Sequence, residues 1–322
     1  MRISTSWSHQ LGVNAILDQQ AKLTETQLKL STGKKILTPS EDPAAAVRLI
    51  DLEQVTKQTQ QYQNNIATAR QRLSLEEANI QSVVDTLYRI KELTVQGLND
   101  SNTQPDREAI AAELDQLNDH LLGIANTKNA NGEYIFSGYA TDTQPYAKGP
   151  TFDATIVPGN PVNSYPYFGD NNQRNIQIGP SRIVTDGNYG EQVFGVSDVL
   201  PSDTAPLDPA DAQSPKNLFE IVDKLSVSLK ENNPQDISLT ELDDALNRIV
   251  TVETTIGARM HALDRQESTN DDYILDMQKT TSDIGDLDYA EAISQFNLQN
   301  VSLQAAQQAY TRVQNLSLFN YL

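Results

Sequence analysis

The sequence predicts a mainly α-helical protein with a β insert, in which coiled-coil-like helices from both flanks of the chain form a long rod. Glycine and proline are segregated: eight of the 15 glycines fall from Gly138 to Gly195, and ten of the 14 prolines from Pro145 to Pro215. The flanks are nearly free of both and rich in Gln, Asn, Ala and Leu. This switch in composition indicates long helices interrupted by a turn-rich segment.

The N-terminal flank begins with a helical pattern in which Ile16, Leu23 and Leu30 recur every seven residues. A seven-residue apolar repeat is typical of a helix that packs along one seam against another helix. The helix is expected to end at Ser31-Thr32-Gly33, because glycine suits the left-handed conformation that follows many helices.

A second, long helix is expected to begin at Asp42 and Pro43, with the aspartate as N-cap and the proline in the first turn. Its seam consists of Ile66, Leu73, Ile80 and Leu87, joined by Ala69, Val83 and Ile90. A third helix should follow Pro105 and carry one apolar face, made of Ile110, Leu114, Leu117, Leu121 and Ile124.

The middle of the chain has the composition of a small β domain. Residues 133–139 are predicted to form a strand or hairpin arm, and residues 154–157 and 175–178 are β-prone pieces separated by turn signals. Helix is expected to resume at Ser214-Pro215. Because both flanks have coiled-coil-like helical patterns, we expect the middle segment to be an insert between the two halves of one helical rod.

The C-terminal flank mirrors the N-terminal one. A long helix is expected to open near Ser238, with an apolar stripe formed by Ile249, Ile256, Met260 and Leu263. In the last segment, aromatic and leucine side chains recur every seven residues with smaller apolar ones beside them: Tyr289, Phe296, Leu303 and Tyr310, with Ala292, Ala306 and Val313.

The terminal seams are polar for a coiled coil, because Gln20, Gln27 and Gln299 are expected at core positions. Helices of this kind are marginal alone, so we expect the ends to fold fully only against neighbouring subunits. The chain thus divides into an N-terminal assembly and export segment, the N-terminal half of the rod, the β-rich insert, the C-terminal half of the rod and a C-terminal assembly helix: residues 1–42, 43–139, 140–213, 214–285 and 286–322.

The composition disfavours several functions. The formal net charge of −19 disfavours binding to nucleic acid, and the lack of cysteine excludes disulfides and thiolate chemistry. The first residues lack the apolar stretch of a secretory signal, and no run of about 18 apolar residues predicts a membrane span. We expect a chain that resides in the cytoplasm or is exported by a route that needs no cleavable signal.

No catalytic or metal site is predicted. The three histidines are far apart in the sequence, and no phosphate-binding glycine loop or nucleophile elbow occurs. Asp283, Asp286 and Asp288 lack the loop that calcium sites use, so we expect them to cap and charge the start of the last helix. We therefore expect no enzyme activity and no cofactor.

Several motifs, taken in order, resemble the flagellin family. Leu28 to Ile36 followed by Ser40 to Ala46 is similar to its N-terminal signature, and Ile256 to Arg259 with Asp288 to Ala292 is similar to its C-terminal half. The motif residues are Ser31, Thr32, Gly33, Asp42, Pro43, Gly257, Arg259 and Asp288. Within the family, residues 1–5 and 317–322 look like the hook–filament junction subgroup, that of the third hook-associated protein. The resemblance covers roughly residues 1–139 and 215–322.

The resemblance implies a structural subunit of the bacterial flagellum, exported unfolded through the flagellar type III channel. It implies a ring at the hook–filament junction that serves as a platform for flagellin polymerisation. The partners would be other copies of the chain, the first hook-associated protein, flagellin and an export chaperone on the C-terminal helix, with no nucleic acid and no membrane. The residues expected to drive assembly are those of the terminal seams: Ile16, Leu23, Leu30, Phe296, Leu303, Tyr310 and Val313.

Two alternatives stay open on the sequence. Flagellin, the bulk subunit of the filament, shares both flanks with the junction proteins. A coiled-coil adaptor or sensor unrelated to flagella would share the periodicity, and it predicts a stably helical monomer that resists protease at both ends.

Overall fold

The computed structural model describes residues 3–149, 151–152, 162–196, 217–233 and 237–315. Within these ranges the chain forms long helices and a few short strands, so the prediction of a mainly helical protein with a β insert is confirmed. Contacts divide it into two compact units, one of residues 1–60 with 271–322 and one of residues 61–270. Both boundaries fall inside long helices.

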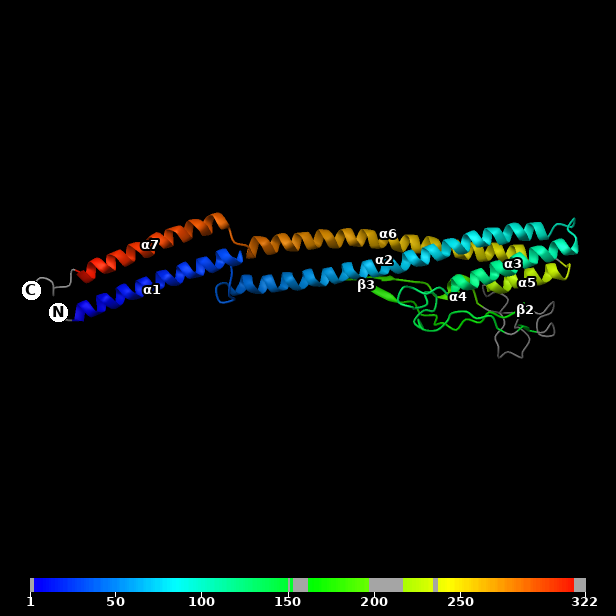
Figure 1. Ribbon diagram of the computed structural model, residues 1–322, viewed down its shortest axis with the longest axis horizontal. Helices are drawn as coiled ribbons and strands as arrows, with labels where there is room; N and C mark the ends of the chain where they lie inside the picture. The colour runs from blue at the N-terminus through cyan, green and yellow to red at the C-terminus, as the bar shows by residue number, and fades with distance from the viewer. Residues whose placement is uncertain (1–2, 150, 153–161, 197–216, 234–236, 316–322) are drawn as a thin grey trace, which may run out of the picture. The chain divides into compact units, whose positions relative to one another are not determined.

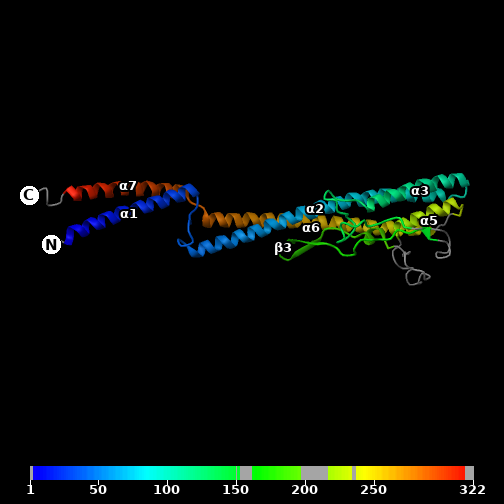
Figure 2. The same ribbon diagram turned by 60° about the horizontal axis from the view of Figure 1, so that its bottom comes forward.

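The first unit pairs the two ends of the chain. Helix α1 (Ile3–Thr32) and helix α7 (Tyr289–Asn315) lie side by side and run in opposite directions (Figures 1 and 2). The unit also holds the start of α2 (Pro43–Gly97) and the end of α6 (Ile237–Gly285). The predicted limits of the first two helices are confirmed, because α1 stops at Thr32 and α2 starts at Pro43.

The seam between α2 and α6 forms part of the core of the second unit. All the predicted seam positions of α2 are buried, as are those of α6 except Met260, which packs against the core half-buried. Ion pairs fix the antiparallel register at the edges of this seam. Arg70 Nη2 lies 2.7 Å from Asp264 Oδ1 and 2.5 Å from Glu267 Oε2, and Lys91 Nζ lies 2.5 Å from Asp243 Oδ1.

Helices α3 (Gln104–Ala125) and α5 (Leu218–Lys230) pack against each other in the same unit. A capping box starts α3: the Thr103 hydroxyl and the Thr103 N–H both donate to the Asp106 carboxylate, and these two bonds, the hydroxyl bond foremost, lower the pKa of Asp106. The predicted apolar face of α3 is buried, with Leu117 partly so. A hydrogen bond from Ser226 Oγ to Ala111 O (3.2 Å) joins the two helices.

The insert is small and irregular. Its described residues form two antiparallel pairs of strands, β1 (Thr151–Phe152) with β2 (Val162–Asn163) and β3 (Asn175–Gly179) with β4 (Arg182–Thr185), followed by a short helix, α4 (Gly190–Phe194). The β-prone piece at 175–178 is therefore confirmed as a strand. The pieces at 154–157 and at Ser214-Pro215 lie outside the described residues.

The prediction of a strand or hairpin arm at residues 133–139 is wrong apart from one residue, Tyr134. The segment forms turns, and its single ladder contact is an isolated bridge between Tyr134 and Lys128. A strand alternates its side chains between two faces, whereas Phe136 and Ser137 are adjacent and both fully buried. Gly138 then has a φ of 64°, which breaks an extended conformation.

An aromatic cluster joins the insert to the helices of its unit. Phe136 meets Phe194 edge to face at 5.2 Å between ring centroids, and Tyr146 meets Phe219 at 5.0 Å. Asn65 Nδ2 on α2 also donates to Gln177 O at 2.7 Å. The insert thus packs along the helices and shares one core with them.

Candidate assembly surface of the terminal helices

The pairing of α1 with α7 rests on a few close contacts along their length. The rings of His9 and Tyr310 meet edge to face at 5.9 Å, and a Cβ on Gly12 would lie 2.9 Å from the Tyr310 ring. Further along, Gln19 Nε2 donates to Gln299 O at 3.3 Å. Rising numbers in α1 therefore meet falling numbers in α7, as an antiparallel pair requires.

The predicted seam residues lie on the inner sides of this pair. They are half-buried, in contrast to the exposed residues beside them: Ile16, Leu23, Leu30, Phe296, Leu303 and Tyr310. Val313 belongs to α7, but its side chain is outside what the structure describes. The seam is therefore first an intrachain interface, which joins the two ends of one subunit.

The prediction that Gln20 and Gln27 occupy the seam is wrong, because both are exposed. A heptad seam alternates steps of three and four residues, which places Gly12, Gln19 and Thr26 between the leucine and isoleucine positions. Thr26 is buried, and its hydroxyl donates to Lys22 O at 3.0 Å. The seven-residue spacing of Gly12, Gln19 and Thr26 is the signal that would have found them.

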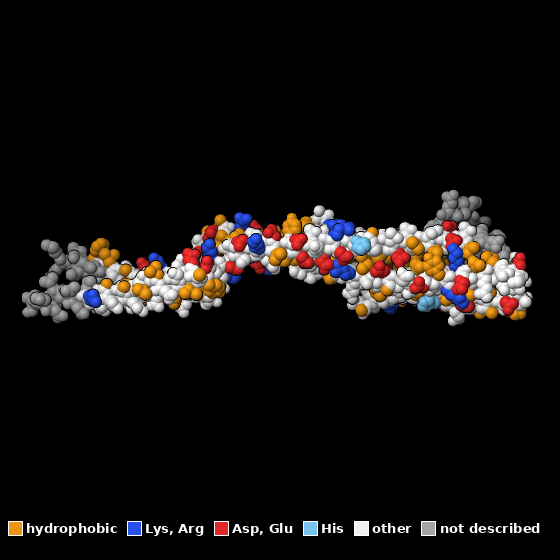
Figure 3. All heavy atoms as spheres, turned by 90° about the horizontal axis from the view of Figure 1, so that it is seen from above, with side chains coloured by type: hydrophobic (Ala, Val, Ile, Leu, Met, Phe, Trp, Pro, Cys, Tyr) orange, Lys and Arg blue, Asp and Glu red, His pale blue; other side chains and the backbone are white. Residues whose placement is uncertain are grey.

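The outer sides of the pair carry large apolar residues that are exposed to solvent. In α7 the exposed fractions are 69% for Leu298, 65% for Val301 and 50% for Ile293. In α1 the matching group consists of Trp7, Leu11, Leu17 and Leu28. Only two charged side chains, Glu291 and Arg312, occur in all of α7. Figure 3 shows hydrophobic side chains spread over this part of the molecule, with few charged ones between them. A surface of this kind is suited to contact with further apolar helices.

Gly33 and Tyr289 meet where α1 ends and α7 begins. Gly33 has a φ of 69°, and its N–H donates to Lys29 O at 2.9 Å to close the helix. This confirms the predicted left-handed cap. The Tyr289 hydroxyl lies 2.9 Å from the position of a Cβ on this glycine. Both the backbone angle and the close ring therefore favour glycine here.

Two backbone hydrogen bonds tie the connections between the helices to each other. Leu287 N–H donates to Gly33 O at 2.9 Å, and Lys35 N–H donates to Gly285 O at 2.8 Å, around an antiparallel bridge between Lys34 and Asp286. The break between α1 and α2 thus lies beside the break between α6 and α7.

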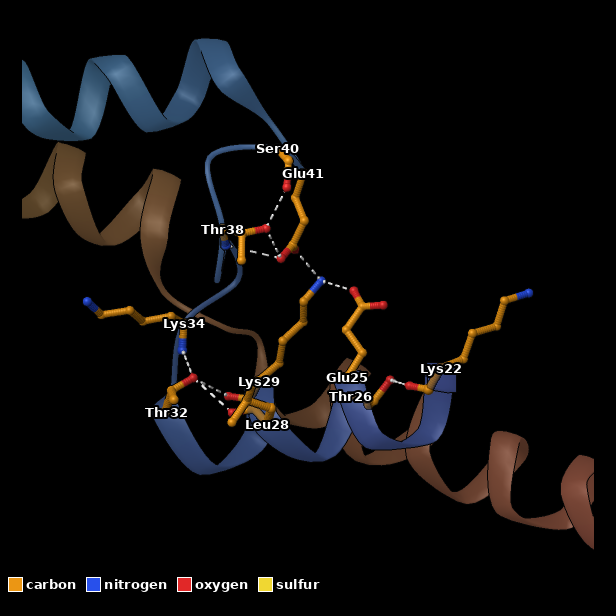
Figure 4. Close-up of polar contacts among 10 residues, drawn as sticks. All are labelled: Lys22, Glu25, Thr26, Leu28, Lys29, Thr32, Lys34, Thr38, Ser40 and Glu41. Atoms are coloured by element: carbon orange, nitrogen blue, oxygen red, sulfur yellow. Dashed lines mark hydrogen bonds and ion pairs between the residues drawn. The ribbon is translucent and has the colours of Figure 1, made fainter. Parts of the chain in front are cut away.

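Lys29 holds the connection between α1 and α2 against α1 (Figure 4). Its Nζ lies 2.8 Å from Glu25 Oε1 on the same helix and 2.8 Å from Glu41 Oε2 in the connection. The carboxylate of Glu41 also accepts from Thr38 N and Oγ1, both at 3.2 Å. Hydrogen bonds to Glu25 and Glu41 raise the pKa of Lys29, and the bond to Lys29 lowers the pKa of Glu41.

The two aspartates of the motif cap the helices that follow the connections. Asp42 Oδ1 accepts from Ala45 N at 3.0 Å, and Asp288 Oδ1 accepts from Ala290 N at 2.9 Å. Both bonds satisfy amides that the first turn leaves without a helical partner. The predicted capping role is confirmed for Asp42 and Asp288. It is wrong for Asp283, which lies in the last turn of α6, and for Asp286, whose carboxylate accepts from Ser282 Oγ.

The remaining motif residues have different settings. Ser31 and Thr32 are exposed, and their hydroxyls donate to Leu28 O at 2.8 and 2.9 Å. Gly257 and Arg259 lie in the second unit, on α6. A Cβ on Gly257 would meet no atom within 4 Å, whereas Arg259 is half-buried and contacts the insert.

Among the described residues, no group of three or more His, Asp or Glu side chains is arranged to hold a metal ion. No helix within the same ranges is long and apolar enough to cross a membrane.

Comparisons with known proteins agree with this arrangement. Residues 3–141 match the family model for the bacterial flagellin N-terminal helical region, and residues 239–322 match that for the C-terminal helical region. Flagellar hook-associated protein 3 of Escherichia coli is 30% identical over 331 aligned positions, covering 99% of each chain. The protein of the same name from Salmonella typhimurium is 29% identical with the same coverage.

A solved structure shows the same fold. The crystal structure of flagellar hook-associated protein 3 from Legionella pneumophila aligns with a TM-score of 0.57 at 23% identity. The alignment covers 72% of this chain and 98% of the other.

Proposed function

This chain belongs to the flagellar hook-associated protein 3 family, and we propose that it assembles as a ring at the hook–filament junction and gives flagellin a platform on which to polymerise. The family is one of flagellar structural proteins and is not enzymatic. The observation that carries the proposal is the end-to-end match to hook-associated protein 3, which includes the insert as well as the flanks.

The terminal helices support assembly with other copies of the chain. Two paired helices bury only one side of each, and Leu298, Val301 and Leu17 remain more than half exposed on the outer sides. Each large apolar side chain of this kind gains about 1.5–3 kcal/mol when it is fully buried. A ring of subunits would bury these side chains between neighbouring α1–α7 pairs, with residues 1–42 and 286–322 as the assembly segments.

The same surface accounts for the other proposed partners. Before assembly, the exposed apolar side of α7 needs a cover, which an export chaperone on the C-terminal helix would supply. After export through the type III channel, the ring would contact the first hook-associated protein on one side and flagellin on the other. The protein would then be secreted and held in the flagellum.

Flagellin itself is the second candidate, because the family models that match both flanks are those of flagellin. The two functions differ in what the purified protein does alone. A filament subunit polymerises into long filaments without a cap of another protein. A purified junction subunit does not polymerise into filaments at the same concentration.

Deletion of the gene in its host tests the proposal. We expect electron microscopy to show hooks without filaments, and we expect flagellin monomers in the culture medium. Absence of both filaments and secreted flagellin would favour the flagellin alternative. Normal filaments would contradict both.

A further inference from the structure

The insert is fastened to α2 and α6 by a buried asparagine. Asn188 is 2% exposed, and its N–H and Nδ2 both donate to Glu76 Oε1, at 3.2 and 2.7 Å. From the other helix, Arg259 Nη1 donates to Asn188 Oδ1 at 3.1 Å. One side chain of the insert is thus bonded to both long helices. This gives Arg259 of the family motif a contact that the sequence did not predict.

A second anchor lies two residues earlier. Asp186 is also 2% exposed, and it accepts from Arg72 Nη1 on α2 at 2.5 Å. Arg174 Nε, just before β3, lies 3.6 Å from its other oxygen. The charged groups that face Glu76 are therefore Arg259 from α6 and Asp186 from the insert, and the guanidinium groups of Arg72 and Arg174 lie against Asp186.

Glu76 is an unusual partner for this contact because its carboxyl is almost fully buried, with 3% exposure. Burial raises its pKa from 4.5 to about 7. The hydrogen bonds from Asn188 and the charge of Arg259 oppose this rise, and the charge of Asp186 adds to it. Near neutral pH the carboxyl therefore exists in both protonation states.

We propose that Glu76 and Asn188 form a proton-dependent clip that fastens residues 186–190 of the insert to α2 and α6. When the segment is docked, it covers the Glu76 carboxyl together with Asn188. When the segment is released, water reaches the carboxyl and its pKa returns toward the ordinary value of 4.5. The docked form therefore holds more protons than the released form between pH 4.5 and about 7.

The sign of the pH dependence follows from this difference. The form that binds more protons is favoured by acid, so docking is strongest near pH 4.5 and weakens as the pH rises to about 7. Above that value Glu76 is ionised in both forms and contributes no further change. For one proton, the equilibrium between docked and released segments changes by at most about tenfold per pH unit.

Hydrogen exchange on the full-length chain tests the clip. The measured quantity is the protection of backbone amides in residues 186–190, corrected for intrinsic exchange, between pH 5 and 8. We expect the protection in the wild type to fall several-fold per pH unit up to about pH 7 and then to level off. In Glu76→Gln the amide oxygen still accepts from Asn188 but no longer titrates, so its protection should be flat.

Glu77→Gln is the matched control, since it removes the same charge one residue away on α2. It should keep the pH profile of the wild type. Equal slopes in the wild type and Glu76→Gln, or a flat profile in the wild type, would overturn the proposal.

A titration of the Glu76 carboxyl by carbon NMR gives an independent test on the wild type, whatever the stability of the Gln variant. A pKa near 7 is expected. Asn188→Ala should raise it further while the segment stays docked, because the hydrogen bond that Nδ2 donates to the ionised carboxyl is lost and only the one from the backbone N–H remains. A carboxyl that titrates near its ordinary 4.5 would rule the clip out.

Discussion

The Tyr289 hydroxyl lies 2.9 Å from the point at which any side chain on Gly33 would begin. The two residues lie side by side at the end of α1 and the beginning of α7. It explains why a glycine predicted only as a helix cap is restricted twice, by its φ of 69° and by the ring beside it. The stability of the α1–α7 pair therefore depends on this contact as well as on the seam.

Gly33→Ala should destabilise the α1–α7 pair by about 1–2 kcal/mol, the usual cost of a left-handed backbone for a residue with a Cβ. Thermal unfolding followed by circular dichroism measures the loss. Gly33→Asn is the matched control, because asparagine tolerates this conformation better, and it should lose less. Equal stability of Gly33→Ala and the wild type would contradict the role of the cap.

Substitutions at Leu303 and Leu298 test the intrachain seam and the outer surface of α7 separately. Leu303→Asp places a charge in the half-buried seam and should destabilise the α1–α7 pair by on the order of 2 kcal/mol. We expect loss of helical signal and rapid proteolysis of both ends, with the insert still folded. Incorporation into hook-tipped structures should be abolished.

Leu298→Asp changes a side chain that is 69% exposed on the same helix. We expect the isolated protein to keep its helical signal and its protease resistance, because the intrachain seam is unchanged. Incorporation at the hook should still fail, since the charge lies on the surface proposed to meet neighbouring subunits. Normal incorporation of this variant would refute the assignment of the outer surface.

Gln299→Leu should stabilise the pairing of α1 with α7. The side-chain oxygen of Gln299 is buried without a hydrogen-bond partner among the described residues, and its backbone oxygen keeps the bond from Gln19. Replacement of a buried amide by an apolar group removes a desolvation cost of about 1 kcal/mol or more. The melting temperature should rise, whereas Gln307→Leu, on an exposed position of α7, should leave it unchanged. A lower melting temperature for Gln299→Leu would mean that its amide stabilises the seam.

Glu41→Gln should loosen the connection between α1 and α2. The change weakens the pair with Lys29, which holds residues 33–42 against α1. Trypsin should therefore cleave faster after Lys34 and Lys35 than in the wild type. Because the pKa of Glu41 is lowered in the folded protein, the pair contributes above pH 4.5 and is lost as the pH falls through the lowered value.

Glu53→Gln serves as the control for this cleavage. It removes a pair with Lys57 that lies wholly within one helix, and it should not change the rate at the connection. The difference between the two variants should shrink at high salt, where exposed ion pairs are screened. A Glu41→Gln protein cleaved no faster than the wild type would show that the pair does not hold the connection.

The helices were predictable because their signals are local and repeated. Residues such as Leu73 and Ile80 recur at helical spacing, and Asp42 and Pro43 mark a helix start by their own chemistry. The same reasoning identified the seam of the terminal helices, and it misplaced Gln20 and Gln27 because a strict step of seven does not show the intermediate positions.

The insert and its contacts were not predictable in the same way. Residues 133–139 have strand-like side chains, yet the burial of Phe136 among aromatic rings from distant parts of the chain holds them in turns. The contact of Asn188 with Glu76 and Arg259 joins three segments that are far apart in the sequence. Neither the spacing nor the composition of those segments predicts this contact.

The central claim, that this protein is a subunit of the hook–filament junction, is tested most directly by its position in the flagellum. Intact flagella labelled with gold-tagged antibodies against the insert would be imaged by electron microscopy. The account predicts gold in a single narrow band between the hook and the filament. Gold along the whole filament would contradict it and would favour the flagellin alternative.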